Sequence, residues 1–239
     1  MDTTYILAGF VIAFLILSLG VHEAAHAWVA NLCGDSTAKD RGRLTLNPIA
    51  HIDPFMTVIL PLVLILTVRM PFGGAKPVPV VASNLRSPLR DMMLVALAGP
   101  ASNVLLAIAF MLAHKVLLSW GGMGATQLAP QVMLWCMYMN ILLAVFNMIP
   151  VPPLDGSRVM SYILPYSLRQ KYDSLERFGL LIVVAMLYFG VFAAVIEPTV
   201  GGLVRYADGS WDVGRVTSSG RVVDAPVISW LHQLTGGTW

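Results

Sequence analysis

The fold of this chain is decided by residues 5–32, YILAGFVIAFLILSLGVHEAAHAWVANL, an apolar run whose second half carries ionisable side chains. A helix rises about 1.5 Å per residue, so a run of this length crosses a hydrocarbon core of about 30 Å. His22 and His26 are four residues apart, which stacks their imidazoles on one helix face, where both can bind one zinc ion. Glu23 can then reach a zinc-bound water as general base.

The membrane setting makes this HExxH pattern informative. The pattern alone occurs by chance, but ionisable side chains are costly inside a membrane span and indicate a functional site there. The sequence therefore predicts a zinc metalloprotease that cuts within the bilayer. The alternative is that two histidines and a glutamate near a helix end line a polar interface between helices.

The composition is that of an integral membrane protein. Hydrophobic residues make up 57% of the chain and charged residues 12%, which indicates lipid as the solvent. The net charge is only +2 and the basic residues are scattered over loops, so the sequence predicts no nucleic-acid partner. Cys33 and Cys136 form no CxxC pair, which argues against a disulfide framework and a thiolate zinc site.

Three later apolar segments, residues 94–118, 132–149 and 178–196, are also long enough to span a membrane. Residues 55–68 differ, because this apolar stretch has only fourteen residues and is interrupted by Pro61. A stretch of that length is typical of a re-entrant helix. We therefore expect an all-α polytopic membrane protein with four spanning helices and one re-entrant helix.

The basic residues predict the orientation. Both flanks of residues 55–68 are basic, so we expect both to face the cytoplasm, with the N-terminus outside and the active site toward the cytoplasmic side of the cell membrane. A full span at residues 55–68 would instead place Asp155 on the opposite side of the membrane from His22 and His26. A shared metal site therefore favours the re-entrant interpretation.

Asp155 is the candidate third ligand, since catalytic zinc usually takes three protein ligands. It ends the stretch NMIPVPPLD at residues 147–155, in which three prolines unwind the end of a predicted span. Gly156 follows and allows close approach of the backbone. The alternative role for Asp155 is the N-cap of a helix that starts near Gly156.

The chain resembles the site-2 protease family, specifically its compact bacterial members without a PDZ or CBS domain. The resemblance covers roughly residues 5–196 and is carried by five blocks in order, which are HEAAH at 22–26, GRLTLNPIAHIDP at 42–54, GGAKPVPV at 73–80, ALAGPASN at 96–103 and FNMIPVPPLDGSRV at 146–159. Five ordered blocks are far more specific than HExxH alone.

The resemblance implies a role for each matching residue. His22, His26 and Asp155 would bind one Zn²⁺ per chain, and Glu23 would be the general base. Asn147 would hold the substrate or stabilise the oxyanion, although a membrane asparagine is also often a helix-helix contact. The expected substrate is a single transmembrane helix of a membrane-anchored regulatory protein that another protease has already shortened, as in regulated intramembrane proteolysis.

Three other segments support further expectations. The block from Gly99 to Ser102 has small residues that suit close packing against the HExxH helix. Residues 73–80 predict a small β element at the membrane face. His51 and Asp53 fit equally well a supporting role at the site and a polar turn.

The expected organisation is a protease domain at residues 1–197 and a C-terminal tail at 198–239 with a hairpin and an interfacial helix. The predicted activity is hydrolysis of a peptide bond in a transmembrane helix by zinc-activated water. Two alternatives are an integral-membrane metal transporter, which would tend to show internal repeats, and a catalytically inactive homologue that binds membrane proteins. An inactive homologue would be expected to lack Glu23 or a ligand.

Overall fold

The computed structural model describes residues 3–59, 63, 74–120, 122–124 and 127–189, and every regular element in those ranges is helical. The α-helices are α1 (Thr3–Leu32), α2 (Thr37–Asp40), α4 (Pro88–Ser119), α5 (Leu128–Asn147), α6 (Asp155–Ile163), α7 (Tyr166–Asp173) and α8 (Gly179–Tyr188). The shorter pieces are the 3-10 helices η1 (Pro48–His51), η3 (Ala82–Asn84) and η4 (Ser174–Phe178) and the π-helix η2 (Pro54–Ile59).

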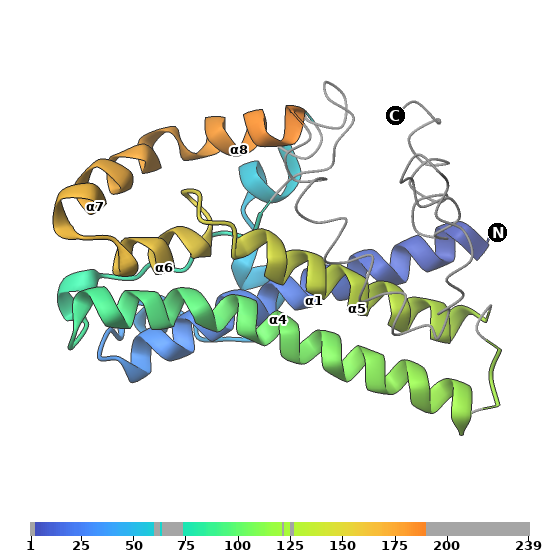
Figure 1. Cartoon of the computed structure of the whole chain (residues 1–239). Helices are drawn as coiled ribbons and strands as arrows, with labels where there is room; N and C mark the ends of the chain where they lie inside the picture. The colour runs from blue at the N-terminus through green and yellow to red at the C-terminus, as the bar shows by residue number, and fades with distance from the viewer. Residues whose placement is uncertain (1–2, 60–62, 64–73, 121, 125–126, 190–239) are drawn as a thin grey trace.

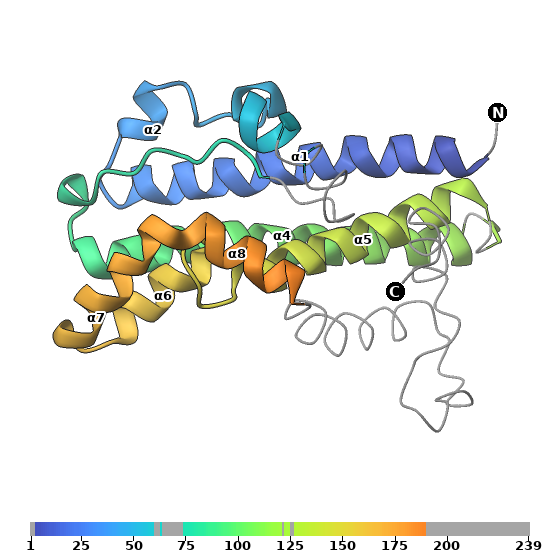
Figure 2. The same cartoon turned by 90° about the horizontal axis from the view of Figure 1, so that it is seen from above.

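Three long helices, α1, α4 and α5, form the body of the molecule and lie side by side (Figures 1 and 2). Within the described residues, three helical segments are long and apolar enough to cross a membrane, namely Gly9–Leu32, Pro88–Ser119 and Leu128–Asn147. A fourth span was predicted at residues 178–196, where the structure describes α8 only to Tyr188. Most of the predicted re-entrant stretch after η2, and the whole predicted tail at 198–239, lie outside the described residues.

The long helices have apolar side chains both where they contact one another and on their outer faces. A buried cluster joins α1 to α5, and it consists of Leu7, Val11, Val132, Trp135 and Cys136. The outer faces are equally apolar, with Leu105, Leu112 and Val116 all exposed along α4. A helix that is hydrophobic all round needs an apolar environment on its outer side as well.

The chain reverses sharply between α5 and α6, which brings Asp155 back toward α1. Gly156 makes this turn fit, because a Cβ atom there would lie 2.3 Å from the carbonyl oxygen of Met148. The N-cap of α6 is Leu154, and Asp155 is the first residue of the helix. The alternative interpretation of Asp155 as an N-cap is therefore wrong.

Residues 74–86, here called the strap, run along α1 (Figure 2). Backbone N–H groups attach the strap at several points, with Lys76 donating to the His51 carbonyl at 2.7 Å and Arg86 to the Cys33 carbonyl at 3.1 Å. No strand is present in the part of residues 73–80 that the structure describes, so the predicted β element is not found there. Pro77 and Pro79 lack the N–H groups that a strand ladder requires.

Asp35 fixes the strap to the end of α1. Its side chain has no exposed surface and accepts hydrogen bonds from the backbone and hydroxyl of Thr37, the backbone N–H of Val81 and the side-chain amide of Asn84. Burial would raise the pKa of Asp35, but these hydrogen bonds outweigh it and hold the pKa below its ordinary value. The stabilisation is therefore present above the ordinary carboxyl pKa of about 3.9 and is lost as the pH falls through the folded-state value.

Asp35→Ala is expected to lower the free energy of unfolding by about 1–3 kcal/mol, because the backbone N–H of Val81 and the side-chain amide of Asn84 lose a charged acceptor. Thermal unfolding of the detergent-purified protein measures the loss. Asp40→Ala is the control, since Asp40 is exposed and accepts only a surface hydrogen bond from Ser36. An unchanged melting midpoint for Asp35→Ala would show that the strap is held in another way.

Candidate metal centre

His22, His26 and Asp155 come together at the contact between α1 and the start of α6. The Nε2 atoms of His22 and His26 are 3.0 Å apart. Asp155 places Oδ2 3.2 Å from His22 Nε2 and Oδ1 3.4 Å from His26 Nε2. Both histidines are buried, and the three donor atoms lie within 4.8 Å of one another. The i, i+4 spacing places the two imidazoles on one face of α1 in an edge-to-face arrangement, and the turn after α5 supplies the carboxylate.

The hydrogen bonds on the far side of each ring fix which nitrogen faces the cluster as an acceptor. His26 Nδ1 lies 2.7 Å from the Val95 carbonyl oxygen, which can only accept, so Nδ1 carries the proton. In the neutral ring that binds a metal, the Nε2 atom of His26 then presents a lone pair to its neighbours. That lone pair and the Asp155 carboxylate point at one small volume, and no hydrogen bond to the buried Asp155 Oδ2 is found among the described residues.

A cation would bind the two imidazole nitrogens and the carboxylate together. Two imidazole nitrogens and a carboxylate are the ligand set of a catalytic zinc site, which also keeps a position for water. Exposed acidic clusters are common without a metal. Here, by contrast, both histidines are buried and the carboxylate of Asp155 lies close to their ring nitrogens. The residues present therefore fit Zn²⁺.

Gly99 of α4 lies directly against the two rings. A Cβ atom at Gly99 would stand 2.5 Å from Cε1 and Nε2 of His26 and 2.6 Å from Cε1 of His22, far inside van der Waals contact. The glycine therefore lets α4 pack on the ligand face of α1, as the small residues at 99–102 predicted.

Glu23 follows His22 on α1 and is half-buried. Its Oε2 atom accepts a hydrogen bond of 3.1 Å from the backbone N–H of Val78 in the strap. This contact fixes the direction of the carboxylate next to the ligand cluster.

The other predicted residues lie outside the cluster. The amide of Asn147 donates to the Leu143 carbonyl at 3.0 Å within α5, and no hydrogen bond joins it to Glu23 or the three clustered residues. His51 donates from Nε2 to the Thr45 carbonyl at 3.0 Å, and Asp53 accepts from the Phe55 N–H at 2.9 Å. Both contacts are local, as expected for a polar turn.

Two groups at the centre were not predicted. One is the Val95 carbonyl, and the other is Asn103, whose Oδ1 is 3.2 Å from His22 Nδ1. Asn103 is four residues after Gly99, so helical spacing already places both on one face of α4. That spacing is the signal that could have identified Asn103 in the sequence.

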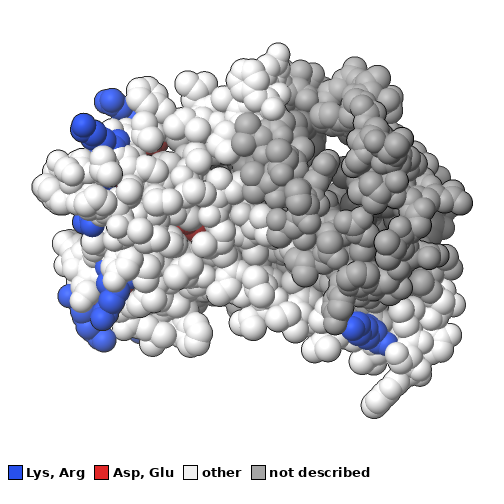
Figure 3. Space-filling view, viewed as in Figure 1, with Lys and Arg blue, Asp and Glu red and all other residues white. Residues whose placement is uncertain are grey.

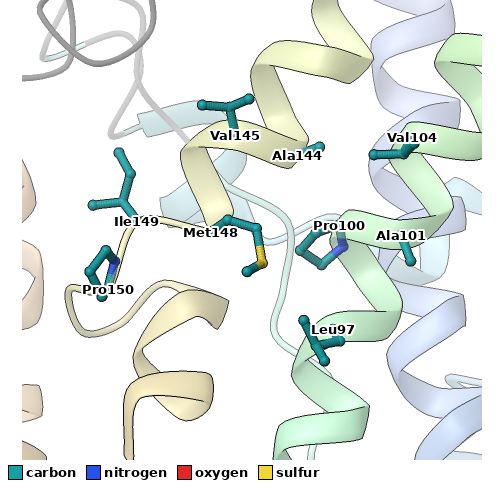
Figure 4. Close-up of a pocket in the computed structure, with 9 residues that line it drawn as sticks. All are labelled: Leu97, Pro100, Ala101, Val104, Ala144, Val145, Met148, Ile149 and Pro150. Atoms are coloured by element: carbon teal, nitrogen blue, oxygen red, sulfur yellow. The ribbon is translucent and has the colours of Figure 1, made fainter. Parts of the chain in front are cut away.

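An apolar groove lies beside the centre, between α4 and the end of α5 (Figure 4). It has a volume of about 740 Å³, and its lining side chains are all apolar, namely Leu97, Pro100, Ala101, Val104, Ala144, Val145, Met148, Ile149 and Pro150. Pro100 follows Gly99, and the Met148 carbonyl packs on Gly156. The buried polar cluster is therefore flanked by a surface suited to hydrocarbon.

The apolar helices and the cluster are what is expected of a membrane protein with a candidate metal site of the HExxH type. The profile of Peptidase family M50 matches residues 114–190. The chain is 38% identical over 195 residues to the provisionally named zinc metalloprotease YwhC of Bacillus subtilis, covering 79% of this chain and 84% of YwhC. The chain belongs to peptidase family M50, the site-2 protease family.

Mycobacterial proteins show the same relationship. The provisionally named zinc metalloprotease Rip2 of Mycolicibacterium smegmatis is 30% identical over 185 residues, which cover 74% of this chain and 66% of Rip2. Rip2 of Mycobacterium tuberculosis H37Rv is 25% identical over 232 residues, covering 95% of this chain and 74% of that protein. No solved structure gives a significant match to the chain. The relatives identify Zn²⁺ as the cofactor, in agreement with the donor set.

Gly99→Ala is expected to weaken zinc binding on the order of 10-fold or more, because the new methyl group displaces both imidazoles. Zinc content after dialysis against a chelator measures this effect. Gly9→Ala is the matched control, since a Cβ atom at Gly9 on α1 meets nothing within 4 Å. Equal zinc retention in the two variants would contradict the packing described for α4.

Proposed function

We propose that this chain is an intramembrane zinc metalloendopeptidase that hydrolyses a peptide bond in the transmembrane helix of a membrane-anchored regulatory protein. One observation carries the proposal, namely the convergence of two imidazole nitrogens and a carboxylate beside Glu23 on a helix apolar enough to span a membrane. Family membership supports the protease chemistry, and the apolar helices support its location in lipid.

The metal would be held by His22, His26 and Asp155. Zinc bound there would polarise the scissile carbonyl and lower the pKa of water in its open coordination position. The chain's own residues then handle the proton. Glu23 accepts it and returns it to the nitrogen of the leaving amine, so the carboxylate ends the cycle as it began. The Val78 N–H steadies Glu23 during both transfers.

Asn147 is proposed to stabilise the negative charge that develops on the scissile carbonyl oxygen. Its amide group has two N–H donors, and one of them is used by the Leu143 carbonyl. The second can reach a substrate placed between the end of α5 and the ligand cluster.

A bilayer substrate imposes its own demands. A peptide bond in a membrane helix is hydrogen bonded internally and shielded from water, so the helix must unwind at the metal centre before it is cut. The buried polar cluster and the apolar groove beside it provide the two environments needed. Polar groups would receive the opened backbone, and the groove would keep apolar side chains out of water.

The charge distribution supports a multi-pass cell-membrane protein with its active site toward the cytoplasm. In Figure 3, most visible Lys and Arg side chains lie at the end of the molecule where α7 and the first turns of α4 lie in Figure 1. Basic residues concentrate on the cytoplasmic side of membrane proteins. We also propose four membrane spans and a re-entrant helix at residues 55–68. The protease domain would comprise residues 1–197, and a tail would follow at 198–239.

Glu23→Gln is expected to lower the rate of substrate cleavage by at least about 100-fold while zinc stays bound, because it removes the base and none of the ligands. The assay is cleavage of single-span proteins by the purified enzyme in detergent, with zinc content measured in parallel. Glu176→Gln is the control, since Glu176 is exposed and pairs with Arg158 at the surface. Undiminished, chelator-sensitive turnover by Glu23→Gln would rule out the proposed mechanism.

A further inference from the structure

Asn103 is a fully buried amide in the middle of α4, a helix long enough to span the membrane. Its side chain has 0% exposure, and its Oδ1 atom lies 3.2 Å from His22 Nδ1. The Nδ2 atom of the same amide is also buried, and it has no hydrogen-bond partner among the described residues. The amide thus uses only its acceptor end toward the ligand ring.

The unpaired Nδ2 atom is a cost that needs an explanation. A buried donor without a partner costs about 1–3 kcal/mol, which an apolar side chain at this position would avoid. Burial in an apolar helix makes the polar side chain still less favourable. Asn103 Oδ1 also accepts a long contact of 3.4 Å from Ser102 Oγ, and the shorter hydrogen bond to His22 is the main interaction that offsets this cost.

Asn140 of α5 shows the contrasting arrangement. It is 1% exposed, and its Nδ2 donates to Ser18 Oγ at 3.0 Å and to the Cys136 carbonyl at 2.8 Å. Its Oδ1 is the atom for which the described part of the chain offers no partner. Asn140 therefore uses its donors to connect α5 to α1, as membrane asparagines often do. Asn103 instead directs its amide oxygen at the imidazole of a candidate metal ligand. Packing of α4 on α1 does not by itself require such an acceptor.

The ligand chemistry of His22 explains the need for an acceptor. Its Nε2 atom faces His26 and Asp155, so that nitrogen must be free of a proton to bind a cation. The ring proton then sits on Nδ1 and requires a hydrogen-bond acceptor. Asn103 supplies one without adding a second negative charge to the membrane interior.

We infer that Asn103 is a positioning residue, which holds His22 in the tautomer and ring orientation that bind zinc. This inference rests on the proposed zinc site. His26 obtains the same support from the Val95 backbone carbonyl, which no side-chain substitution removes. The two ligands are therefore unequal, and His22 alone depends on a replaceable side chain. Gly99, one turn earlier, brings α4 close enough for the contact.

The test measures metal binding and needs no substrate. Asn103→Leu keeps the branching at Cγ and removes the acceptor, so zinc affinity, measured by competition with a chromogenic chelator, should fall 10- to 100-fold. The visible spectrum of the Co²⁺-substituted protein should change as well, because it reports ligand geometry. Asn140→Leu is the matched control, and it should leave zinc affinity and the Co²⁺ spectrum unchanged.

Asn103→Asp separates positioning from a purely structural role. A carboxylate is a stronger acceptor and makes His22 a better ligand, so zinc affinity should be at least that of the wild type. A structural role predicts weaker binding, because the variant buries an extra charge. This variant decides the question even if Asn103→Leu does not fold.

Wild-type zinc affinity in Asn103→Leu would overturn the inference, and so would weaker binding by Asn103→Asp. Either result would leave the proposed protease function standing, because that function is tested by Glu23→Gln on cleavage. Failure of the wild-type protein to bind zinc would overturn both.

Discussion

The structure depends on one electrostatic constraint, the convergence of two imidazole nitrogens and a carboxylate inside an apolar helical body. The Nε2 atoms of His22 and His26 are 3.0 Å apart, and Asp155 approaches both within 3.4 Å. Unpaired polar groups in such surroundings cost several kcal/mol. A cation bound by these three residues would turn this cost into a stabilising interaction.

The surrounding elements serve this constraint in separate ways. In α4, the absence of a side chain at Gly99 leaves room for the two imidazole rings. The Val95 carbonyl and the Asn103 side chain contact the Nδ1 atoms of these rings and orient them. The reversal after α5 delivers Asp155 through the close approach at Gly156. The strap then reaches over α1 to bind Glu23.

Much of the site could be predicted because helical periodicity fixes relative positions along one element. The HEAAH spacing brought His22 and His26 together, and the proline-rich turn identified Asp155. Contacts across elements were harder, because they depend on how helices rotate about their axes. The Asn103 contact is of that kind, and the Val95 carbonyl has no sequence signature. The predicted β element is not found in the described part of residues 73–80, where two prolines remove ladder donors. Most of the predicted re-entrant stretch lies outside the described residues.

X-ray absorption at the zinc edge of the purified wild-type protein tests the central claim most directly, because it reports the atoms bound to the metal. The account predicts one zinc per chain with two imidazole nitrogens at about 2.0–2.1 Å, oxygen ligands completing the shell, and no sulfur. A sulfur ligand from Cys33 or Cys136, or a shell with fewer than two imidazoles, would contradict it.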